Sequence, residues 1–139
     1  MSGRGESLAR LCRQFEIEFV YAFGGRAREV EEWLEGRRAS LASGAADADV
    51  GVKAARALSA EDKVRLSLAL EDLLGVTRVD LVSLSEADPF LAANIVRGER
   101  LYARDAHQAD EYDLYVLRRA GDLAPLERER MALILGESR

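Results

Sequence analysis

Cysteine and histidine are almost missing from this sequence of 139 residues, which holds one of each, Cys12 and His107. A single cysteine excludes an internal disulfide framework and any metal site built from several thiolates. A single histidine excludes a histidine cluster, a zinc triad and a Ser-His-Asp relay, so we interpret His107 as a surface residue. Any bound metal ion would therefore need oxygen ligands. The helical spacing of Cys12 from Leu8 predicts a buried packing role for its thiol.

Long apolar runs are also missing. No stretch approaches the roughly 20 consecutive apolar residues of a membrane span, and no apolar signal core follows the N-terminal Met1. We therefore expect a cytoplasmic protein with no membrane partner.

Lysine is scarce, since Lys53 and Lys63 are the only two among twenty basic residues. Arginine suits bidentate recognition of phosphate or carboxylate groups, although a genomic composition bias explains the arginine excess equally well. The formal net charge of −5 argues against broad nucleic-acid binding, which needs a basic surface. Small nucleotides stay compatible with this charge, because a local cation cluster or a metal ion can hold them.

The length and the apolar fraction of 48% predict one globular domain over residues 1–139, with a core at about 7–105 and a C-terminal helical hairpin at about 106–136. Periodicity and capping signals predict alternating helices and strands. The expected helices cover 7–15, 29–35, 60–74, 89–97 and 106–120, which Gly121 ends, and a final helix that starts at 122–125. The expected strands cover 16–23, 46–52, 77–84 and 100–104, the first central and the last near the sheet edge, and residues 36–45 are expected to form a surface loop.

Two carboxylates stand out in the strand expected at 46–52. Side chains alternate along a strand, so Asp47 and Asp49 share one face while Ala48 and Val50 point to the other. Residues two apart lie roughly 6.6 Å apart along a strand, so the two carboxylates can share one divalent cation or hold two. Taken alone, an Asp-x-Asp pair is more typical of an ordinary solvated strand face.

Two further features can likewise be interpreted either as part of a binding site or as ordinary structure. Gly24 and Gly25 lie between a strand and a helix, where glycines and free amides can cradle a phosphate assisted by Arg26 or Arg28, or can simply form a turn. Asp80 lies in an apolar strand, where a buried charge must bind a cation or form an ion pair, for example with Arg78.

Four stretches together follow the order of a known pattern: Tyr21–Arg28, Ala46–Val52, Arg78–Val82 and Asn94–Tyr102. Over residues 16–105 the chain resembles the minimal nucleotidyltransferases, small members of the DNA polymerase beta-like superfamily. The resemblance implies an α+β fold with a small mixed sheet and helices packed on it.

The resemblance also implies site roles. It assigns Gly24 and Gly25 to a triphosphate-binding turn and Arg26 to the phosphates. Asp47, Asp49 and Asp80 would be the catalytic carboxylates that ligate Mg²⁺ or Mn²⁺, with Asp80 helping to activate the attacking hydroxyl. The implied reaction moves an NMP, AMP above all, from an NTP such as ATP onto a hydroxyl.

Many members of this family are antitoxins encoded with an HEPN-domain RNase toxin, and some transfer AMP to a toxin tyrosine. The resemblance therefore implies an HEPN-type toxin as partner and acceptor. Two family serines are replaced here, by Gly25 and Ala46, and residues 29–45 make a longer connection than is usual. The alternative is therefore a weakened or inactive protein of the same fold that neutralises a partner by binding alone. The sequence leaves the base preference and the oligomeric state open, a homo-oligomer included.

Overall fold

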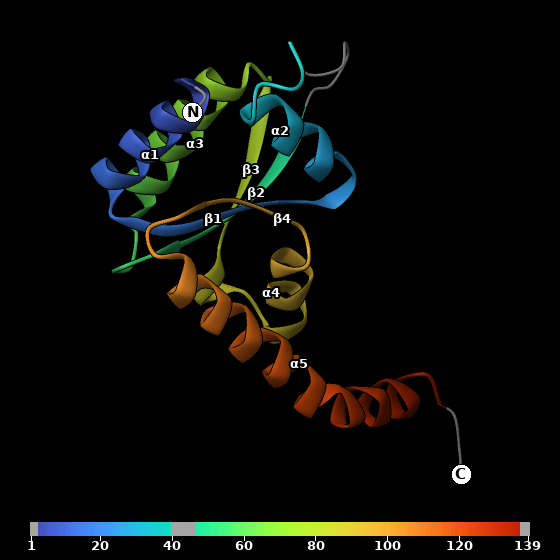
Figure 1. Cartoon of the computed structure of the whole chain (residues 1–139). Coiled ribbons are helices and arrows are strands. Elements are labelled where there is room, and N and C mark those ends of the chain that lie inside the picture. The colour runs from blue at the N-terminus through green and yellow to red at the C-terminus, as the bar shows by residue number, and fades with distance from the viewer. Residues whose placement is uncertain (1–2, 40–46, 137–139) are drawn as a thin grey trace.

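A computed structural model describes residues 3–39 and 47–136, which form a four-stranded sheet with helices on both faces (Figure 1). The strands are β1 (Ile17–Phe23), β2 (Asp47–Ala54), β3 (Arg78–Ser83) and β4 (Glu99–Ala103). The α-helices are α1 (Gly3–Phe15), α2 (Ala27–Leu34), α3 (Ala60–Leu74), α4 (Pro89–Val96) and α5 (Ala106–Ile134), and the 3₁₀ turns are η1 (Gly24–Arg26) and η2 (Leu84–Glu86). The predicted α+β class with a mixed sheet is confirmed. Most of the loop predicted at 36–45, and Ala46, lie outside the described residues.

The strand order in the sheet is β3-β2-β1-β4. β1 pairs antiparallel with both β2 and β4, whereas β2 and β3 run parallel. A parallel pair needs a crossover, which α3 supplies. The central place of β1 and the edge place of β4 match the predictions.

Local signals fix the helix boundaries. The hydroxyl of Ser59 accepts a hydrogen bond from the Asp62 amide (3.0 Å) at the start of α3, and Gly75 ends that helix with φ +70, a conformation open to glycine. The Asp88 carboxylate likewise accepts hydrogen bonds from two amides at the start of α4. These caps were predictable because they depend only on neighbouring residues.

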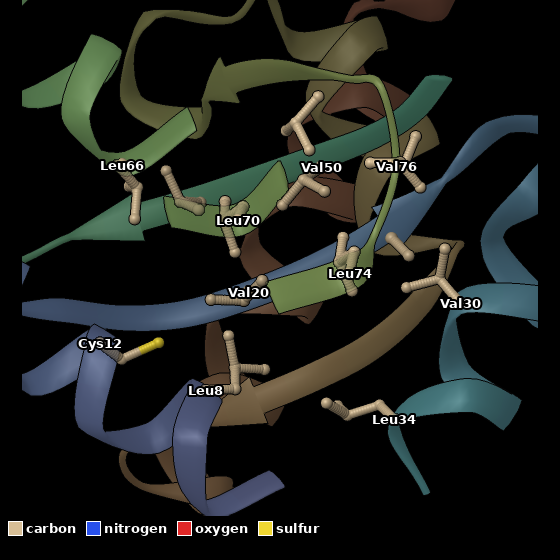
Figure 2. Close-up of a cluster of buried hydrophobic side chains, with 14 of the residues drawn as sticks. Leu8, Cys12, Val20, Val30, Leu34, Val50, Leu66, Leu70, Leu74 and Val76 are labelled. Atoms are coloured by element: carbon tan, nitrogen blue, oxygen red, sulfur yellow. The ribbon is translucent and has the colours of Figure 1, made fainter. Parts of the chain in front are cut away.

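Two hydrophobic cores lie on opposite faces of the sheet. The first packs α1, α2 and α3 against one face, and Figure 2 shows its side chains gathered from these helices and the sheet: Leu8, Cys12, Val20, Val30, Leu34, Val50, Leu66, Leu70, Leu74 and Val76. The thiol of Cys12 is buried here, as predicted, and burial raises its pKa to about 12. The second core packs α4 and α5 against the other face.

The predicted C-terminal hairpin is wrong, because Ala106–Ile134 form one continuous helix of 29 residues. Gly121 and Pro125 suggested a break between two helices. A proline inside a helix clashes with the carbonyl four residues earlier, which here belongs to Gly121, and the result is a bend and not a reversal. Figure 1 shows the axis of α5 changing direction in its C-terminal part. Among the described helices, α5 included, none combines the length and apolar composition that crossing a bilayer requires.

A polar network ties α5 to the sheet beneath the second core. The Tyr21 hydroxyl, on a fully buried side chain, donates to the Asp113 carboxylate. Arg100 of β4 donates to Asp113 (2.7 Å) and to Asp110 (2.8 Å). Burial and the hydrogen bond to Asp113 raise the pKa of Tyr21 well above its ordinary value, so this hydroxyl stays a donor.

We expect Tyr21→Phe to lower the free energy of unfolding by about 1.5–3 kcal/mol, because it removes a hydrogen bond to a charged, partly buried acceptor. Urea unfolding followed by circular dichroism measures the change. Tyr115→Phe is the matched control, since Tyr115 is 57% exposed, and it should change stability by less than about 0.5 kcal/mol. Equal stability of the two variants would contradict the structural role of this network.

Candidate active site

The two carboxylates of β2 lie on the sheet face opposite the first core. Ala48, Val50 and Val52 are buried in that core, so the alternate residues Asp47, Asp49 and Gly51 face the side of α4. A methyl group added to Gly51 would lie 2.5 Å from Cγ2 of Ile95 in α4, which confirms that this face of β2 is directed toward α4. The predicted alternation along this strand is therefore correct.

Strand pairing brings Asp80 to the same place. In the parallel β2–β3 pair, Asp49 lies directly beside Asp80, and Asp47 lies beside Arg78. Val79 and the partly buried Leu81 pack in the first core, so Asp80 faces the same side as Asp49. The structure thus gathers Asp47, Asp49 and Asp80 on one face, at one end of the β2–β3 pair.

The carboxylates influence one another. The pKa of Asp49 is raised, first by burial, then by the charge and hydrogen bonding of Asp80, and then by the charge of Asp47. Arg78 acts in the opposite direction. The ionised cluster is therefore under electrostatic repulsion that a cation would relieve.

Arg78 partly supplies such a charge. Its Nη2 lies 2.8 Å from Oδ1 of Asp80, whose side chain is 39% exposed. The expectation that Asp80 lies buried in an apolar strand is therefore wrong, because this face of β3 is open to solvent at that point. The ion pair with Arg78 weighed as an alternative does form.

The glycine turn lies beside Asp49. Phe23 pairs with Asp49 across the β1–β2 ladder, and Gly24 follows with φ +78. A methyl group on Gly24 would lie 2.7 Å from Oδ2 of Asp49, whereas one on Gly25 would have no neighbour within 4 Å. The turn leads through η1 into α2, so its exposed backbone amides lie next to the carboxylate cluster. The structure brings the predicted turn and the predicted acids together.

Arg26 follows the turn but is already paired. Its Nη2 donates to Oε1 of Glu29 at 2.8 Å, and its side chain is 26% exposed. Its assignment to phosphate binding stays a prediction, and this ion pair would have to open or reorient for that role. Arg28, in the first turn of α2, is exposed.

The donor set suits a hard cation. It consists of carboxylate oxygens alone, which Mg²⁺ and Mn²⁺ accept and which zinc and copper sites seldom use alone. Within the described residues no three acidic or histidine side chains are preset around one point as in a finished metal site. Asp47 is exposed and Asp80 pairs with Arg78, so the three side chains would have to reorient to share one cation. The cluster fits the cation in chemistry and charge, and Asp47, Asp49 and Asp80 are the residues that would hold it.

Sequence reasoning missed the closeness of the α4–β4 turn to this site. The expected helix at 89–97 left Gly98 only as the residue that follows it. A methyl group on Gly98 would lie 2.2 Å from the carbonyl oxygen of Ala22 and 3.1 Å from Cα of Phe23. The only signal in the sequence was the resemblance over Asn94–Tyr102, which gave this segment no role.

Comparisons with known proteins agree with this geometry. A family model described as polymerase beta, nucleotidyltransferase matches residues 6–107. No curated protein sequence is significantly similar to this chain.

Three solved structures illustrate the structural similarity. A toxin-antitoxin structure with AMP-PNP is 22% identical with a TM-score of 0.65, covering 94% of both chains. A tri-AMPylated Shewanella oneidensis HEPN toxin in complex with an MNT antitoxin gives 21% identity and a TM-score of 0.64, over 94% of this chain and 92% of that one. A putative minimal nucleotidyltransferase is 33% identical with a TM-score of 0.52, over 69% of this chain and 86% of that one.

Proposed function

The chain belongs to the polymerase beta nucleotidyltransferase family, and we propose that it is an active, metal-dependent enzyme that transfers AMP from ATP to a hydroxyl on an HEPN-type toxin. The single observation that carries this proposal is the pairing of Asp49 with Asp80 in register, with Asp47 on the same face and the Gly24 turn alongside. A solvated strand face alone would not explain a third carboxylate from a distant segment at the same point.

In this proposal the side chains act by position and charge. The amides of Gly24 and Gly25 bind the triphosphate. The carboxylates of Asp47 and Asp49 lie beside it and would hold the cation that bridges them to the phosphates. Asp80 lies where it can accept the proton of the attacking hydroxyl. The hydroxyl oxygen bonds to the α-phosphorus, and the bond to the departing pyrophosphate breaks. A bound Mg²⁺ would supply neutralisation of the triphosphate charge.

The acceptor is inferred from the similar structures. One contains a tri-AMPylated HEPN toxin beside its antitoxin, and another is a toxin-antitoxin with AMP-PNP. At 21–22% identity these share the fold with this chain, and the partner is carried over here as a proposal. A toxin tyrosine is the acceptor that this comparison favours.

A second candidate function is neutralisation of the toxin by binding alone. Two observations favour it: Gly25 stands where the family has a serine hydroxyl, and Arg78 already pairs with Asp80. Losing one phosphate-binding hydroxyl would weaken nucleotide affinity by about 10–100-fold. The backbone amides of the turn would still bind phosphate, so the weakening is partial.

One experiment separates the two candidates. ATP labelled in the α-phosphate is incubated with Mg²⁺, the chain and an HEPN-type toxin, and wild type is compared with Asp47→Ala. Label on the toxin with wild type alone supports the enzyme. Equal inhibition of the toxin RNase by both proteins, without label transfer, would support the binding function and overturn the enzyme.

We also expect Mg²⁺ or Mn²⁺ to raise the melting temperature of the free protein. A cation that binds the folded cluster at about ten times its Kd stabilises by roughly 1.4 kcal/mol, which corresponds to about 4 °C for a domain of this size. Asp80→Asn should reduce this rise by more than half, since it removes one charge from the cluster. Differential scanning calorimetry between 0 and about 10 mM MgCl₂ measures it, and a metal-independent melting curve for wild type would contradict a shared cation site.

A further inference from the structure

Arg97, which ends α4, lies on the opposite side of the glycine turn from the carboxylates. We propose that it is a phosphate-binding residue and contacts the nucleotide triphosphate as it lies over Gly24 and Gly25. This inference rests on the proposed function and adds to it a residue that neither the motif pattern nor the spacing of the acids indicates.

The position of Arg97 follows from strand register. β1 and β4 pair antiparallel, with Ala22 beside Glu99. Arg97 and Gly98 directly precede β4, so they lie at the end of β4 that pairs with the end of β1, where the Gly24 turn begins. The close approach of Gly98 to Ala22 and Phe23 shows that the turn does continue along β1.

The Gly24 turn follows β1, which lies between β2 with its carboxylates and β4 with Arg97 just before it. On the β2 side, Oδ2 of Asp49 reaches the Cα region of Gly24. On the β4 side, Arg97 precedes Gly98, which packs against Ala22 and Phe23 at the end of β1. A triphosphate carries too much negative charge for a carboxylate cluster to hold without cations on both flanks, and a guanidinium matches phosphate oxygens in a bidentate manner.

The guanidinium of Arg97 is available. It is exposed, and within residues 3–39 and 47–136 its side chain has no ion pair or hydrogen bond. Three other arginines near the site are engaged, because Arg26 pairs with Glu29, Arg78 with Asp80 and Arg100 with Asp110 and Asp113. Arg28, at the start of α2, is exposed like Arg97 and is a second cation on the other side of the turn. An unpaired cation beside a phosphate-binding turn is unexplained by the fold alone.

A structural role for Arg97 predicts a different result. As the C-cap of α4, a cation there would stabilise the helix dipole by a small amount. Its loss would then lower stability slightly and leave nucleotide affinity unchanged. Nucleotide binding and thermal stability therefore distinguish the two roles.

The test compares binding of AMP-PNP and of AMP, in Mg²⁺, by isothermal titration calorimetry. Arg97→Ala should weaken AMP-PNP binding by about 10–100-fold, as expected for a lost hydrogen bond to a charged group, while AMP binding changes less than threefold. Arg97→Lys should restore part of the affinity because it keeps the charge. Arg119→Ala, an exposed arginine on α5, is the matched control and should bind AMP-PNP like wild type.

The other outcomes of this experiment separate the inference about Arg97 from the proposed function. Equal AMP-PNP affinity of wild type and Arg97→Ala overturns this inference and leaves the proposed function standing. Failure of wild type to bind AMP-PNP at all overturns both. Should the alanine variant prove unstable, Arg97→Gln repeats the test, because glutamine keeps more of the arginine side chain than alanine does but lacks its charge. Unchanged AMP-PNP affinity of that variant also overturns the inference.

Discussion

Asp49→Asn is expected to lower the rate of AMP transfer to the toxin by about 10³-fold or more. Asp49 pairs in register with Asp80, follows Asp47 on the same face and lies beside Gly24, so it is the central carboxylate of the proposed site. Losing one negative ligand from a metal-dependent phosphoryl-transfer centre removes several kcal/mol of transition-state stabilisation. The asparagine keeps the shape of the side chain. Initial rates of α-label incorporation measure the effect.

The same substitution should stabilise the fold at neutral pH. Burial and the neighbouring acids raise the pKa of Asp49 above its unfolded value, so the folded state binds this proton more tightly. Wild type therefore loses stability as pH rises through the unfolded and then the folded pKa, and asparagine avoids that loss. We expect Asp49→Asn to be more stable than wild type at pH 7, and we expect this difference to disappear at low pH, where the carboxyl of wild type is protonated in both states.

Asp122→Asn is the matched control, because this exposed carboxylate lies on α5. It should change neither the transfer rate nor the pH dependence of stability. A stability gain for Asp49→Asn with an unchanged transfer rate would show that the carboxylate cluster is electrostatically strained but does not act in the reaction.

The parts of the fold that were predictable from sequence depend on residues close together in the chain. The alternation of Asp47 and Asp49 against Ala48 and Val50 follows from the strand period of two. The start of α3 at Ser59 follows from a cap that needs no distant partner. Such local rules predicted the strands, their order along the chain and the two faces of β2.

The parts that were missed depend on contacts between distant segments. The exposure of Asp80 depends on which helix covers that end of β3, and hydrophobic periodicity in the sequence does not indicate this. The continuity of α5 through Gly121 depends on packing of its first half against the second core, which outweighs the local cost of glycine and proline. The place of Gly98, and of Arg97 before it, at the end of β1 depends on the β1–β4 register. Each of these is a tertiary fact without a local signature.

The resemblance succeeded where local rules could not, because it linked three separate segments before any pairing was known. Its expectation that Asp47, Asp49 and Asp80 share a site required the parallel pairing of β2 with β3, which the structure contains. The roles of these residues in catalysis and metal binding stay predictions.

Gly24→Ala is expected to reduce both stability and transfer, for two separable reasons. Alanine at φ +78 is strained by about 1–2 kcal/mol, because its Cβ approaches the backbone carbonyl. The new methyl group would also lie 2.7 Å from Oδ2 of Asp49. That atom ends a flexible side chain, so the carboxylate can rotate away at little cost in stability. The rotation displaces the group that positions the triphosphate, and a displacement of about 1 Å can lower a rate by 10²-fold.

Gly25→Ala provides the control one residue away. A methyl group on Gly25 meets no atom within 4 Å, and its φ is not positive, so stability should stay within about 0.5 kcal/mol of wild type and transfer should continue. Urea unfolding and label transfer are measured on both variants. Because the strain and the displaced carboxylate act on different quantities, a Gly24→Ala variant that loses stability but transfers AMP at the wild-type rate would show that the turn is only a structural element. Loss of transfer in Gly24→Ala alone ties the reaction to the contact between this glycine and Asp49.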